Sequence, residues 1–172
     1  MQTSSLPGRV DPWRLAAERG RLDGALPVAA LSRLAAASHR ASGLASAALS
    51  AGIDANGVRF IEGVVRAEVE LVCQRCLEPF RWPLEAAVRL GLARDEAGAG
   101  RLPEPYEPLL VPEGTLSVAD LIEDELLLAL PQIPRHADRA ECVANGYQPP
   151  RSDGDRPLAV LGLMLQDGHG SR

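Results

Sequence analysis

Two short groups of residues in this sequence could do chemistry. One is the C-x-x-C tetrapeptide Cys73-Gln74-Arg75-Cys76, and the other is the pair His136 and Cys142. Thiolate and imidazole groups are preferred zinc ligands, and four of them in a tetrahedral array make a structural zinc site. Cys73, Cys76, His136 and Cys142 are therefore a candidate zinc site, and zinc is the one candidate cofactor. The alternative is that Cys73 and Cys142 are small buried apolar residues and His136 is a surface histidine.

A thiol-redox centre is a further interpretation of the C-x-x-C pair. Such a centre places its first cysteine at the N-terminus of a helix, where the helix dipole lowers the pKa of the thiol. Pro79 and Pro83 follow Cys76 closely, and two prolines with this spacing rule out a regular helix. The chain also has three cysteines, an odd number that does not suit a set of structural disulfides. The redox interpretation therefore has the weaker support.

The elements that position the C-x-x-C pair are predicted by side chains that alternate with period two over residues 43–94. Apolar residues from Ile61 to Cys73 share one face, while Glu62, Arg66 and Glu68 share the other. Asn56-Gly57 is a strong hairpin signal within this stretch. The pattern predicts an antiparallel β-meander with one wet and one dry face, and it places the C-x-x-C at a hairpin tip.

Helices are expected before and after the meander in the sequence. Residues 1–42 are predicted to be helical, with Asp11 as a cap and Pro12 in the first turn. Residues 95–116 form an acidic loop with a short strand at 106–111, and Ser117 caps a helix over 117–131 that has an acidic and an apolar side. A Pro/His/Cys segment follows at 132–142. We expect one α+β domain over 1–142, then a linker and a short apolar segment within 143–172.

Length and composition limit the function. A chain of 172 residues can hold one domain with a sizeable core. The formal charge of −5 argues against a protein that coats nucleic acid non-specifically, and an aromatic share of 3% argues against base stacking. No segment is long and apolar enough for a membrane helix, and no signal peptide is evident. A cytoplasmic protein without a small-molecule substrate is expected.

Several of these segments resemble one bacterial family. Residues 69–80 (VELVCQRCLEPF), residues 120–131 (DLIEDELLLALP) and Pro134-Arg135-His136 look like the YceD family of large ribosomal RNA subunit accumulation proteins. The resemblance extends to residues 102–108 and 156–161. It implies a cytoplasmic, non-enzymatic factor in ribosome biogenesis, needed for the synthesis, processing or stability of 23S rRNA.

Two versions of such a binding role follow from the charges. In the first, arginines of the meander contact the 23S rRNA precursor: Arg59, Arg66, Arg75, Arg81 and Arg89. In the second, acids of the loop and helix hold a basic large-subunit ribosomal protein: Glu104, Glu107, Glu113, Asp120, Glu123 and Asp124. The net charge favours the second version. The alternatives are a small zinc-binding or thiol-redox protein unrelated to ribosomes, or a nuclease that uses carboxylate-bound metal on rRNA.

Overall fold

The computed structural model describes residues 5–112 and 114–148. The chain divides into two compact units, Met1–Arg135 and His136–Arg172, and each is described by itself. The expected division into a domain over 1–142 and a tail over 143–172 stays a prediction. The apolar C-terminal segment of that tail lies outside the described residues.

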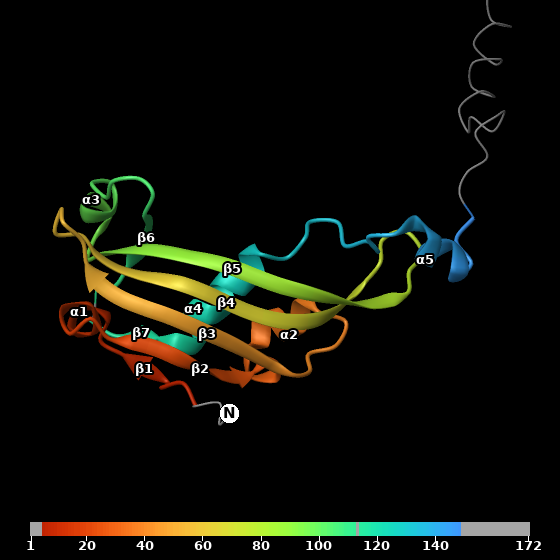
Figure 1. Ribbon diagram of the computed structural model, residues 1–172, viewed down its shortest axis with the longest axis horizontal. Helices are drawn as coiled ribbons and strands as arrows, with labels where there is room; N and C mark the ends of the chain where they lie inside the picture. Colours follow the sequence, from red (N-terminus) through yellow and green to blue (C-terminus); the bar gives the residue numbers. More distant parts are fainter. Residues whose placement is uncertain (1–4, 113, 149–172) are drawn as a thin grey trace, which may run out of the picture. The chain divides into compact units, whose positions relative to one another are not determined.

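A five-stranded sheet dominates the first unit. In the order in which they lie side by side, its strands are β2 (Arg21–Pro27), β3 (Leu44–Ile53), β4 (Arg59–Val72), β5 (Pro79–Ala93) and β6 (Glu107–Leu110). Neighbours from β2 to β5 are antiparallel, and β6 joins the edge of β5 in parallel (Figure 1). The predicted meander is therefore confirmed as β3, β4 and β5, and the strand expected near 106–111 is confirmed as β6.

The core lies between one face of the sheet and the helices α2 (Ser32–Ala37) and α4 (Val118–Leu128). Side chains alternate along β4, so that Ile61 and Val65 are fully buried while Arg66 is exposed. Leu34 of α2 and Leu126 of α4 are also fully buried. Figure 1 shows both helices behind the sheet. One face of the sheet is exposed to solvent and the other is covered by helices, which confirms the α+β class.

Local signals in the sequence explain where several elements begin. Asp11 caps α1 (Pro12–Ala17), since its Oδ1 accepts the N–H groups of Trp13 at 2.9 Å and Arg14 at 3.1 Å. Ser117 caps α4 by accepting the N–H of Asp120 at 3.3 Å. Between β3 and β4, the Asp54 carboxylate accepts the N–H groups of Asn56 and Val58, both at 2.9 Å. Such side-chain acceptors satisfy backbone donors that the elements leave unpaired.

The prediction of helix throughout residues 1–42 is wrong for part of that stretch. Helices occupy α1, α2 and the short 3-10 helix η1 (Val28–Ala30), but Arg21–Pro27 forms β2. This strand pairs with β3 along its whole length, from Arg21 opposite Ser50 to Pro27 opposite Leu44. Leu22 of β2 is buried in the core. The open edge of β3 supplies the hydrogen bonds that hold β2. This pairing with β3 outweighs the weak local preference of residues 21–27 for a helix.

Smaller elements complete the described chain. Strand β1 (Arg9–Val10) pairs antiparallel with β7 (Leu116–Ser117), just before α4. Helix α3 (Glu96–Ala99) lies in the expected acidic loop, and α5 (Arg139–Ala144) belongs to the second unit. Within the described residues, none of the helices has the length and apolar character needed to cross a membrane.

Candidate functional site

The C-x-x-C pair lies in the turn between β4 and β5. The Cys73 carbonyl accepts the N–H of Leu77 at 2.9 Å, and the Cys73 N–H donates to the carbonyl of Glu78 at 2.9 Å. Leu77 takes a left-handed φ of 64°, which lets the chain reverse within a few residues. The turn is also held by the N–H of Gln74, which donates to the carbonyl of Pro134 at 2.8 Å. Because β5 then begins at Pro79, the pair has the turn geometry of a metal knuckle and lacks the helix of a redox centre.

A second pair of donors lies in the other unit. Asp138 caps α5, since its Oδ1 accepts the N–H of Ala140 at 2.7 Å. The helix places the Sγ of Cys142 3.5 Å from the Nδ1 of His136. Cys142 is fully buried and His136 is 8% exposed. A thiol and an imidazole this close together could supply two of the four ligands of a zinc site.

The three cysteines are thiols and not halves of a disulfide. Cys73 and Cys142 are fully buried, and Cys76 is half-buried. His136 and Cys142 form one pair of donors and Cys73 and Cys76 the other, and a metal ion held by all four stays a proposal. The donor set of three sulfurs and one nitrogen suits zinc, because hard cations such as Mg²⁺ prefer oxygen ligands.

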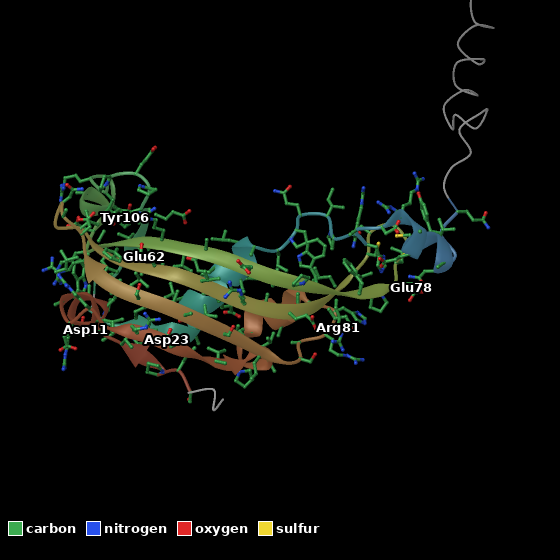
Figure 2. All side chains as sticks on the ribbon, viewed as in Figure 1. Asp11, Asp23, Glu62, Glu78, Arg81 and Tyr106 are labelled. Atoms are coloured by element: carbon green, nitrogen blue, oxygen red, sulfur yellow. The ribbon has the colours of Figure 1, made fainter. Side chains whose placement is uncertain are left out.

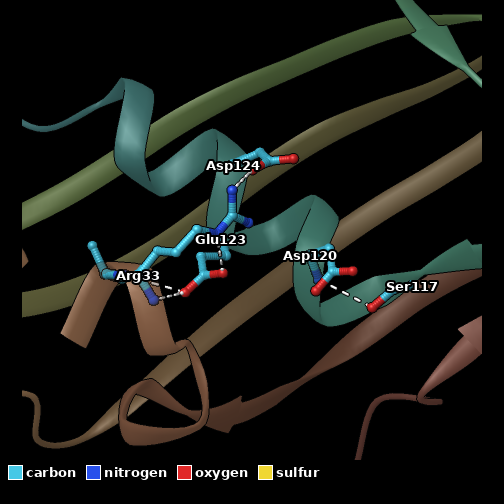
Figure 3. Close-up of polar contacts among 6 residues, drawn as sticks. Arg33, Ser117, Asp120, Glu123 and Asp124 are labelled. Atoms are coloured by element: carbon cyan, nitrogen blue, oxygen red, sulfur yellow. Dashed lines mark hydrogen bonds and ion pairs between the residues drawn. The ribbon is translucent and has the colours of Figure 1, made fainter. Parts of the chain in front are cut away.

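Among the predicted acidic residues, Glu123 has a role inside the protein. It is 4% exposed, and its Oε1 accepts the N–H groups of Arg33 at 2.6 Å and Leu34 at 3.1 Å. Its Oε2 pairs with the Nε of Arg33 at 2.8 Å, and Arg33 also reaches Asp124 at 2.7 Å (Figure 3). Burial raises the pKa of Glu123, but these hydrogen bonds and the Arg33 charge outweigh it and hold the pKa below its ordinary value.

The expectation that Glu123 belongs to a partner-binding surface is therefore corrected. Its carboxylate is occupied and inaccessible, which also removes it as a metal ligand for a nuclease. The other acids differ: Glu104, Glu107, Asp120 and Asp124 are all exposed. Asp124 pairs with Arg33, whereas no described residue forms an ion pair with Glu104, Glu107 or Asp120. Glu113 lies outside the described residues.

Glu125 is a functional candidate that the sequence analysis missed. Its side chain is buried, at 9% exposure, and no described residue donates a hydrogen bond or an ion pair to it. Burial, followed by the nearby charges of Glu107 and Asp124, raises the pKa of this carboxyl. A signal was available, because residue 125 falls on the apolar stripe of α4 with Leu121 and Ile122. A carboxylate in a core position of a helix is unusual and marks a possible site.

The arginines of the meander are mostly engaged within the protein. Arg66 pairs with Glu85 at 2.8 Å, and Arg81 pairs with Glu68 at 3.2 Å. Arg89 lies 5.5 Å over the ring of Tyr106, and Arg59 lies 5.9 Å over the ring of Trp13.

These arginines do not gather in one place. Arg81 lies toward the turn end of β5, while Tyr106, which Arg89 contacts, lies at the opposite end of the sheet (Figure 2). Arg75 is half-buried in the C-x-x-C turn. The sheet therefore presents arginines matched by local acids and rings, and not one concentrated basic patch.

The fold and the donors define an α+β protein built on one mainly antiparallel sheet, with one pair of potential metal ligands in each unit. Comparison with known proteins gives its family. The family model described as large ribosomal RNA subunit accumulation protein YceD matches residues 61–157, which include most of β4, all of β5 and α4, and Cys73, Cys76, His136 and Cys142. The chain belongs to the YceD family.

A relative with this name supports the assignment. The large ribosomal RNA subunit accumulation protein YceD of Haemophilus influenzae is 36% identical over 138 residues, which cover 80% of this chain and 79% of that protein. No solved structure matches the chain significantly.

Proposed function

We propose that this protein is a cytoplasmic, non-enzymatic ribosome-biogenesis factor that supports accumulation of 23S rRNA by binding a basic large-subunit ribosomal protein. The family description and the name of the Haemophilus relative both give accumulation of large-subunit rRNA as the role, and neither gives a catalytic activity. No small-molecule substrate or membrane enters the proposal.

The observation that carries the choice of partner is the contrast between the two sets of charges. Arg66 and Arg81 are paired with acids of the same sheet, and Arg59 and Arg89 lie over aromatic rings. The exposed acids Glu104, Glu107 and Asp120, in contrast, have no cationic partner among the described residues. A basic ribosomal protein would supply the missing positive charge, and complementary charge speeds capture of such a partner. The net charge of −5 also favours a basic protein over RNA as the partner.

Crosslinking in living cells, with both RNA and protein partners identified, tests this proposal. The test variant combines Glu104→Gln, Glu107→Gln and Asp120→Asn. The matched control removes three acids elsewhere through Glu18→Gln, Asp23→Asn and Glu96→Gln. We expect the yield of crosslinked ribosomal protein to fall about tenfold with the test variant. Cells that carry this variant should accumulate less 23S rRNA, while the control variant should behave like the unmodified protein.

Direct binding to rRNA is the competing outcome. It would appear as crosslinks to 23S precursor that are lost in an Arg66→Gln, Arg89→Gln variant and that weaken steeply with salt. That result would replace the protein-binding version. Cleavage of precursor rRNA by the purified protein would overturn the non-enzymatic proposal altogether.

We also propose that zinc is held by Cys73, Cys76, His136 and Cys142. The two halves support this separately, since Cys73 and Cys76 share one tight turn and the Sγ of Cys142 already contacts His136 at 3.5 Å. Bound zinc would be structural, because four protein ligands leave no open position for a substrate or water.

A further inference from the structure

A shallow depression of about 250 Å³ lies on the first unit where β5, β6 and α4 meet. Three carboxylates and no cationic side chain contribute to its lining: Glu85, Glu107 and Glu125. Of these, Glu85 is already paired with Arg66 at 2.8 Å. Glu107 and Glu125 therefore supply the uncompensated negative charge of the depression.

Glu125 carries the argument because it is a largely buried acid that lines the depression and has no cationic partner among the described residues. Glu125 is 9% exposed as a residue, its carboxylate reaches the open depression, and no described residue gives it an ion pair or a hydrogen bond. A buried carboxylate without a partner costs free energy, so proteins usually pair such groups. The raised pKa of this carboxyl, caused first by burial and then by Glu107, agrees with a group that lacks its counter-charge.

The other residues that line the depression are apolar, and they indicate what kind of cation would fit there. Ala86, Ala87, Leu128 and Ala129 contribute methyl and aliphatic surface, and Leu128 is 77% exposed. Lysine and arginine combine a long aliphatic stem with a terminal charge, so the stem can pack on these residues while the charge reaches Glu125. A hydrated divalent metal ion fits less well, since it requires about six oxygen ligands and gains nothing from apolar walls.

We propose that this depression, termed the Glu125 depression, receives one lysine or arginine side chain of the protein partner, with Glu125 as its anchor and Glu107 beside it. This inference rests on the proposed function, because it names the contact that a basic ribosomal protein would make. β6 is the edge strand of the sheet, so a partner can approach the depression from outside the sheet without displacing any strand.

Binding of a basic peptide to the full-length protein tests the depression directly. The probe is a synthetic decapeptide of alternating arginine and glycine, and its control replaces every arginine by citrulline, which has the same shape without the charge. We expect Glu125→Gln to weaken binding of the arginine peptide by about tenfold or more. Glu18→Gln, which removes an exposed acid at the C-terminal end of α1, should change binding by less than about twofold.

A second readout locates the contact. In ¹³C-labelled protein, the carboxyl resonance of Glu125 should report a lower pKa when the arginine peptide is bound, and no change with the citrulline peptide. Equal binding by the unmodified protein and the Glu125→Gln variant would overturn the proposal. So would absence of binding, or a Glu125 resonance that responds to Mg²⁺ and not to the peptide.

Failure here is distinguishable from failure of the proposed function. If the Glu125 depression does not bind the peptide while crosslinking still captures a ribosomal protein through Glu104, Glu107 and Asp120, the partner is retained and only this contact is wrong. If crosslinking finds RNA alone, the partner class itself is wrong.

Discussion

At the scale of single residues, Gly63 of β4 is a position that has no room for a Cβ atom. It lies opposite Leu49 of β3 and has a φ of +146°. A Cβ atom there would lie 2.1 Å from the carbonyl oxygen of Ala48 and 2.9 Å from the Cα of Leu49. Both neighbours are backbone atoms, so neither can move aside without disturbing the pairing of β3 with β4.

Replacing this glycine should therefore be costly. We expect Gly63→Ala to lower the free energy of unfolding by about 3 kcal/mol, from the positive φ and the overpacking together. Urea denaturation followed by circular dichroism measures the change. Gly8→Ala is the matched control, because a Cβ at Gly8 meets nothing within 4 Å, and it should shift the stability by less than about 1 kcal/mol. Equal effects of the two substitutions would refute this account.

The sequence could place Gly63 on a face of the sheet but could not show why it is glycine. Alternation reveals which side chains share a face, whereas the distance between neighbouring backbones depends on the twist of the finished sheet. Glu125 illustrates the same limit. Its position on the apolar stripe was visible, but its lack of a partner depends on where β5 and β6 lie in space.

At the scale of elements, Glu123 joins α4 to α2. The residue before α2 is Leu31, which has no side chain able to cap a helix. Glu123 takes over that role from a distant helix by accepting the N–H groups of Arg33 and Leu34. The two helices therefore depend on each other, since α4 completes the hydrogen bonding at the start of α2.

Glu123→Ala should destabilise the protein by about 2 kcal/mol, the combined effect of a lost cap and unpaired buried N–H groups. The effect should depend on pH. The folded pKa lies below the ordinary value of 4.5, so the stabilisation is fully present above pH 4.5 and is lost as the pH falls through the folded pKa. Thermal or urea unfolding at several pH values measures the difference, which should shrink on acidification.

The control for this prediction is Asp124→Asn. Asp124 also pairs with Arg33, but its side chain is 56% exposed, so removing its charge should cost less than about 1 kcal/mol. A pH-independent difference between the unmodified protein and Glu123→Ala would contradict the assigned role.

Prediction succeeded for elements whose signals are local. The meander follows from period-two alternation, and α1 and α4 follow from Asp11 and Ser117 as caps. Prediction failed for β2, whose formation depends on the open edge of β3, and for the surface role of Glu123, whose partner is ninety residues away in sequence. In each failure a long-range contact decided the outcome, and no local pattern encodes such a contact.

At the scale of the whole molecule, the described charges divide into those paired within the protein and exposed acids that form no ion pair with a described residue. Glu123 pairs with Arg33, and Arg66 and Arg81 of the sheet pair with Glu85 and Glu68. The exposed acids Glu104, Glu107 and Asp120 are the ones that the proposed basic partner would contact. Acids that converge on paired metal ions would be needed for a nuclease, and Glu123 is already committed to α2. The described part of the chain therefore supports a binding factor.

The proposed zinc site makes the stability of the whole chain depend on metal. Its ligands come from two segments, the turn after β4 and residues 136–142, that are far apart in sequence. A metal ion that links distant segments stabilises the folded chain, because the unfolded chain does not hold such a site preformed.

We therefore expect the purified full-length protein to contain about one zinc ion per chain, measured by inductively coupled plasma mass spectrometry. Chelation, or Cys76→Ser, should remove the metal and lower Tm by several degrees, because the binding free energy contributes to folding. His39→Gln is the control: this histidine is 45% exposed and outside the donor set, so its loss should leave both zinc content and Tm unchanged. Protein with far less than one zinc per chain, and a Tm that chelation does not alter, would show that the cysteines and His136 pack as ordinary buried residues.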